Sequence, residues 1–179
     1  MLWFQMEEDA AEICVDRAMA LSGDAAQYGR RALQEMEKQS RRMSVRRKEI
    51  RVAQDAAELR RAIAPLVEFV FQRTDQLIAE IRLFLRLQEF APIEERTWQK
   101  ALACLALQRR LIENTCGKLR KTFQKLRDRS RILGAVWQWE ERYLDILDDL
   151  EDVAETIALG LNADALADLE ERDRQTRTA

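Results

Sequence analysis

A chain of 179 residues is long enough for one domain with a hydrophobic core, and five glycines and two prolines leave little material for turns. The chain contains no histidine, which excludes histidine-based acid–base catalysis, histidine-containing triads and histidine metal ligands. The formal net charge of −2 excludes nothing as a total, because the charges are distributed unevenly. No alternating apolar run is bounded by turn residues, so strands are not expected. We predict an all-α fold, a long antiparallel helical bundle or coiled-coil-like hairpins of about five to six helices, with residues 1–170 as a single domain and 171–179 as a frayed polar tail.

The first quarter of the chain is predicted to hold two helices. Residues 3–21 form the first, and Ser22-Gly23-Asp24 is expected to end it and to cap the second. The second continues into the forties, where the sequence is largely polar and basic. We place a turn near residues 40–48, although no strong helix breaker lies there. The pattern leaves open whether residues 24–88 form one helix or two.

A third helix is predicted to extend to about Gln88. It is apolar on more than one side, which is typical of a central helix packed by several neighbours. Pro65 removes one backbone donor inside this segment, so we expect a kink or a new helix start there. The predicted seam of this helix comprises Leu59, Ile63, Leu66, Val70, Thr74, Leu77, Ile81 and Phe84.

Phe90-Ala91-Pro92 is the clearest predicted boundary, and a fourth helix follows it to about Arg129. This helix carries a nearly unbroken 4-3 apolar repeat, which keeps one stripe facing one partner. The repeat steps through Trp98, Leu102, Leu105, Arg109, Ile112, Cys116, Leu119, Phe123 and Leu126. Within it we expect buried side chains at Leu105, Ile112, Leu119 and Phe123.

A fifth helix is predicted to begin near Ser130. Gly160 is expected to end it as a C-cap, and Asn162 to cap a short final helix. Trp137 and Trp139 are two residues apart and face different directions, so we expect one of them in the core. The seam continues through Tyr143, Leu147, Leu150, Ala154 and Ile157, with Val136, Leu144, Ile146 and Val153 beside it.

The chain offers few groups for chemistry. Cys14, Cys104 and Cys116 are isolated, which favours small buried side chains kept reduced in a cytoplasm. Phosphate-cradling glycine motifs do not occur, and the acidic run over residues 145–155 lacks the calcium-loop pattern. The longest apolar run, residues 101–107, is far shorter than the ~20 residues of a membrane span. We therefore expect no cofactor, no metal, no membrane partner and no small-molecule substrate.

Charge is segregated along the chain. The net charge is −5 over residues 1–29, +6 over 30–61, +7 over 109–131 and −11 over 140–173. If the helices alternate in direction, the two basic segments meet at one end of the bundle. The sequence therefore predicts a body with a basic end and an acidic end, a charge distribution that bears on partners.

Two functional hypotheses follow. The first, which we prefer to any enzyme, is a non-enzymatic protein-interaction or assembly component that self-associates or joins a larger complex. The second is a small helical subunit that contacts the nucleic-acid phosphate backbone. The candidate contacts for nucleic acid or an acidic partner are Arg41, Arg42, Arg46, Arg47, Lys48, Lys118, Arg120, Lys121, Lys125, Arg127 and Arg129.

Overall fold

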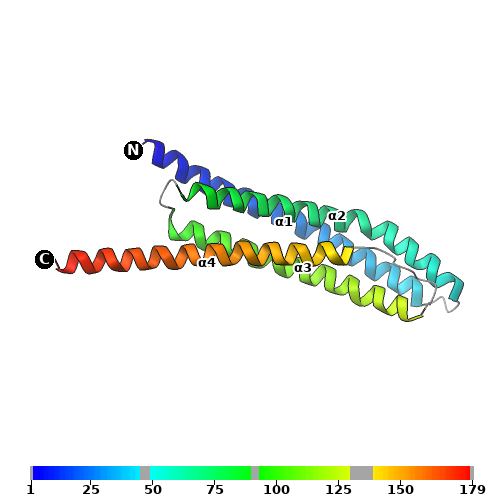
Figure 1. The fold of residues 1–179 in the computed structure, drawn as a ribbon. Coiled ribbons are helices and arrows are strands. Elements are labelled where there is room, and N and C mark those ends of the chain that lie inside the picture. Colours follow the sequence, from blue (N-terminus) through cyan, green and yellow to red (C-terminus); the bar gives the residue numbers. More distant parts are fainter. Residues whose placement is uncertain (1, 45–48, 90–92, 130–138, 178–179) are drawn as a thin grey trace.

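The computed structural model describes residues 2–44, 49–89, 93–129 and 139–177, with side chains chiefly within 9–42, 57–125 and 139–161. The regular structure of these residues is entirely helical, which confirms the predicted all-α class. They form four long helices rather than five or six, and the helices run in alternating directions (Figure 1). In chain order these are α1 (Leu2–Ser44), α2 (Glu49–Leu87), α3 (Glu95–Arg129) and α4 (Trp139–Arg177).

The predicted break at Ser22-Gly23-Asp24 is wrong, because α1 continues through it. Gly23 has no positive φ, so it does not act as a helix terminator. Ala18 and Ala25 are completely buried on either side of it. Their packing outweighs the cost of an interior glycine, which is about 1 kcal/mol relative to alanine.

The predicted C-cap at Gly160 is also wrong, because α4 runs on to Arg177 without a separate final helix. A Cβ added at Gly160 would lie 2.9 Å from Cη2 of Trp98 on α3. Glycine at this position therefore admits a large indole ring rather than ending a helix.

α1 ends at Ser44 and α2 begins at Glu49, and the turn predicted near residues 40–48 falls mainly on residues 45–48, outside the described ones. Residues 24–88 are thus divided between two helices. Within α2, no new helix begins at Pro65, whose ring is exposed. Ile63 and Val67 flank it and are completely buried, so core packing holds the helix together across the missing hydrogen bond.

The four helices form a four-cornered bundle in which α2 and α3, on one diagonal, also contact each other. α1 packs against α2 and α3, and α4 packs against the same two helices from the other side. α1 and α4 therefore occupy opposite corners and, in the described part of the chain, do not approach each other. α4 begins beside the C-terminal part of α3, and its own C-terminal turns extend past the other helices (Figure 1).

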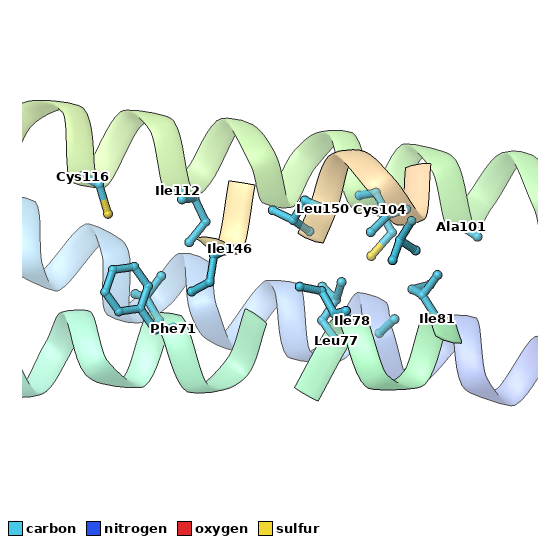
Figure 2. Close-up of a cluster of buried hydrophobic side chains, with 14 of the residues drawn as sticks. Phe71, Leu77, Ile78, Ile81, Ala101, Cys104, Ile112, Cys116, Ile146 and Leu150 are labelled. Carbon is cyan, nitrogen blue, oxygen red and sulfur yellow. The ribbon is translucent and has the colours of Figure 1, made fainter. Parts of the chain in front are cut away.

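The core lies between all four helices, and Figure 2 shows a part of it where α2, α3 and α4 face one another. Phe71 of α2, Ile112 of α3 and Ile146 of α4 point into the same space. The predicted burial of Leu105, Ile112 and Leu119 is confirmed. The prediction for Phe123 falls outside the described side chains.

Arg109 interrupts the apolar repeat of α3, and the structure explains why it can. Its guanidinium lies at the surface, 3.1 Å from a carboxylate oxygen of Glu113 and 3.7 Å from one of Glu151 on α4. Its neighbour Gln108 takes the buried position instead. The repeat therefore shifts by one residue at this turn of the helix.

Gln108 forms a polar contact across the core. Its Nε2 donates a hydrogen bond to Oγ1 of Thr74 at 2.7 Å, and that hydroxyl donates to the carbonyl oxygen of Val70 at 2.7 Å. Oε1 of Gln108 is buried and accepts no hydrogen bond within the described residues. This contact fixes the register of α2 against α3, because sliding either helix would leave more buried polar atoms unpaired.

Candidate functional site

The predicted basic residues of α3 share one end of the bundle. Lys118, Arg120, Lys121 and Lys125 are all exposed. Several other surface cations are paired between helices, as in Arg82 with Asp149 at 3.0 Å. Within the described residues, the four α3 cations make no ion pair, so they present uncompensated positive charge.

The end of α1 lies beside them. Arg41 and Arg42 are exposed there, and Arg41 pairs with Glu37 at 2.6 Å. The structure thus brings these two predicted arginines to the same end as the α3 cations (Figure 1). The remaining candidates fall outside the described residues or side chains, namely Arg46, Arg47, Lys48, Arg127 and Arg129.

A groove of about 410 Å³ runs between α1 and α3 at this end, which we call the basic groove. Oγ1 of Thr122 closes part of its floor with a hydrogen bond of 3.3 Å to Sδ of Met36. Glu37, its one carboxylate, is neutralised by Arg41, so the groove retains the charge of its two lysines. Its lining is Leu33, Gln34, Met36, Glu37 and Ser40 from α1 with Lys118, Lys121 and Thr122 from α3.

The opposite charge lies along α4. Asp149 and Glu151 of this helix pair with Arg82 and Arg109 of neighbouring helices. Five further carboxylates are exposed and have no ion pair among the residues that the structure describes. This acidic face comprises Glu141, Asp145, Asp148, Asp152 and Glu155.

Leu144 is an apolar side chain on this acidic helix surface. It is 54% exposed, although its apolar neighbour Ile146 is buried. The positions three and four residues away lie next to it on a helix, and Glu140, Glu141 and Asp148 occupy three of these. The 4-3 pattern placed Leu144 beside the buried seam and so missed its exposure. Its acidic neighbours at i−4, i−3 and i+4 were the signal that could have revealed it.

The end opposite the basic residues carries exposed carboxylates of Glu89, Glu94 and Glu95, where α2 ends and α3 begins. Asp24, which the predicted turn at Gly23 would also place there, lies instead in the middle of α1, 3.6 Å from Nε of Arg73. The acidic face of α4 extends along the side of the bundle rather than across its end. The body therefore has a basic end, carboxylates at the opposite end and an acidic flank along α4.

The interior holds no reactive thiol. Cys14, Cys104 and Cys116 are buried and free, as their isolated spacing predicted. Burial raises the pKa of the Cys104 thiol to about 11 and that of the Cys116 thiol to about 12. Both thiols therefore stay protonated near neutral pH, where a protonated thiol is a poor nucleophile.

The described residues contain no group of three or more histidine, cysteine, aspartate or glutamate side chains arranged to hold a metal ion. Over the same residues, no helix combines the length and apolarity needed to cross a membrane. Of the two tryptophans that were predicted to diverge, Trp139 is buried in the core, and Trp137 lies outside the described residues.

Comparison of the chain with protein-family models, with curated proteins and with solved structures finds no match.

Proposed function

We propose that this protein is a non-enzymatic helical component that assembles with other protein chains. One observation carries the proposal: unpaired charges of opposite sign are gathered on separate surfaces of one bundle. The acidic face holds five unpaired carboxylates, and the α3 end holds four unpaired cations. Segregated charge creates an extended field that steers charged partners and rejects others.

The interior supports this proposal because its polar groups serve packing. Gln108 and Thr74 join α2 to α3, and the three thiols are buried and protonated. The apolar surplus of the third predicted helix is used in part inside the bundle, since Phe71 and Ile78 are buried, whereas Phe69 and Leu83 remain exposed. Free buried thiols are typical of a reducing compartment, which supports the proposal of a cytoplasmic protein.

Affinity capture from a lysate of the source cells, treated with nuclease, tests the function. The intact chain should retain a protein partner or a second, differently tagged copy of itself. Reversing Glu141, Asp145 and Asp148 to lysine should remove a partner that binds the acidic face, because repulsion replaces attraction. Reversing Asp9 to lysine at the other side of the bundle serves as a control. Retention of no protein by the intact chain at low salt would refute the proposed function.

A second function is favoured by the spacing of the α3 cations. Lys118, Lys121 and Lys125 recur at intervals of three and four residues and are exposed, so one side of the helix could follow a phosphate backbone. Such binding would be weakly dependent on sequence and would fall steeply with salt. Fluorescence anisotropy with duplex and single-stranded oligonucleotides should then show binding that is lost in a Lys118→Glu, Lys121→Glu, Lys125→Glu variant. An unchanged anisotropy with micromolar protein at low salt would exclude this second function for the isolated chain.

A further inference from the structure

The basic groove and the surface around Leu144 are complementary in charge, and each offers apolar side chains to a partner. The groove is a hollow with apolar side chains, Leu33 and Met36, and two unpaired lysines. Leu144 is a projecting apolar side chain bordered by carboxylates. A leucine entering the groove would bury apolar surface while its flanking carboxylates approach Lys118 and Lys121.

We infer that the occupant of the basic groove is Leu144 of a second copy of this chain. This inference rests on the proposed function and names its partner and its site. Charge complementarity selects this occupant: the chain itself supplies an acidic, leucine-bearing helix whose outer side has no partner among the described residues. Attraction between the lysines and the carboxylates would set the orientation, and burial of the leucine would supply most of the free energy.

The arrangement of the helices makes this contact heterologous. The groove lies between α1 and α3, and Leu144 lies on α4, at the corner diagonally opposite α1. One copy can therefore offer its groove to one neighbour and its Leu144 surface to another. Association of this kind continues from copy to copy until a ring closes, and otherwise gives an open chain.

The size of the groove limits the strength of the contact. A hollow of about 410 Å³ accommodates a leucine and parts of its neighbours, well short of a large hydrophobic interface. Two-body association should therefore be weak, with a dissociation constant of micromolar order. Salt should weaken it further, because the flanking charges are exposed.

Mixing two defective variants tests the inference directly. The first variant, Leu144→Asp, keeps its groove but places a carboxylate where the leucine should enter. The second, Lys118→Glu with Lys121→Glu, keeps Leu144 but makes the groove acidic. Sedimentation velocity and light scattering should show self-association of the intact chain and about 10- to 100-fold weaker association of each variant alone, the range set by the loss of one buried leucine.

An equimolar mixture of the two variants should form a 1:1 complex and grow no further. The intact groove of the first variant can accept the intact Leu144 of the second. The reverse contact would bring an aspartate against an acidic groove and is doubly repelled.

Matched controls separate the site from general effects of charge. Leu159→Asp changes a leucine of α4 that is 70% exposed, more than the 54% of Leu144, and should leave association unchanged. Arg60→Glu with Arg61→Glu changes the net charge as much as the groove variant does, at exposed positions of α2 outside the groove lining. Circular dichroism melts check that every variant is folded. If Leu144→Asp does not fold, Leu144→Ser replaces it, and if the groove variant does not fold, Lys121→Gln replaces it.

Three results would overturn the inference. One is an intact chain that stays monomeric up to high micromolar concentration. Another is association that survives both variants, and a third is a variant mixture that forms no complex. Capture of a different protein by a chain that does not self-associate would reject this inference and leave the proposed function standing.

Discussion

Substitution of Gly160 by alanine tests whether the Trp98 indole sets the close packing of α4 on α3. The added Cβ would lie 2.9 Å from Cη2 and 3.1 Å from Cζ3 of this ring. Trp98 is only 1% exposed, and its ring meets Phe84 edge-on at a centroid distance of 4.9 Å. The ring therefore cannot move away freely, and the overpacking should cost about 1–3 kcal/mol.

Alanine also has a higher helix propensity than glycine, and this gain of about 1 kcal/mol partly hides the cost. Gly23→Ala provides the matched control, because Gly23 lies inside a helix and no atom lies within 4 Å of its added Cβ. Gly23→Ala should stabilise the protein by up to about 1 kcal/mol. The free energies of unfolding of the two variants should thus differ by about 1–3 kcal/mol, which isolates the packing cost.

Urea unfolding followed by circular dichroism measures this difference. In a Trp98→Phe background, the smaller ring should reduce the cost of Gly160→Ala. Equal stabilisation by the two alanines would refute the proposed packing of Gly160 against Trp98.

Three further outcomes follow from the core. Leu119→Ala should lower the free energy of unfolding by about 2–5 kcal/mol in urea melts, because the side chain is completely buried, and a loss under about 0.5 kcal/mol would contradict this. Thr74→Val should lower the free energy of unfolding by about 1–3 kcal/mol, because it leaves the buried amide of Gln108 without its acceptor. Adding Gln108→Leu should recover most of that loss. A double-mutant cycle without coupling between the two positions would disprove the contact. The raised pKa values of Cys104 and Cys116 keep both thiols protonated in the folded state. Their contribution to the free energy of unfolding should therefore be fully present below pH 9.0, the ordinary thiol pKa. It should be lost as pH rises toward the folded pKa values of about 11 and 12. Urea melts against pH should show a shallower fall for Cys116→Ala, and an identical slope would contradict the assignment.

The fold could be predicted furthest where one periodic pattern covered many residues. The repeat of α3 predicted buried Leu105, Ile112 and Leu119, because a long stripe has only one way to face a core. The glycine-based boundaries failed for a different reason. A glycine that ends a helix and a glycine that admits a neighbouring side chain look alike in sequence, and only the position of Trp98 distinguishes them at Gly160.

The candidate site was predictable in its charge and not in its shape. Segregated charges along the chain predicted that Lys118 and Arg41 would share one end, since antiparallel packing brings the two basic segments together. The groove and the exposed Leu144 depend on how each helix is rotated about its axis. That rotation follows from contacts between distant residues, such as Arg142 with Asp75, which no local pattern reveals.

Self-association through the charged surfaces is tested most directly by the sedimentation coefficient of the intact chain, measured against protein concentration at low and at high salt. This self-association predicts a coefficient that rises with concentration across the micromolar range at low salt. It also predicts that high salt flattens this rise, because oppositely charged exposed surfaces draw the copies together. A single coefficient of monomer size at every concentration and both salt levels would contradict assembly of this chain with itself through its charged surfaces.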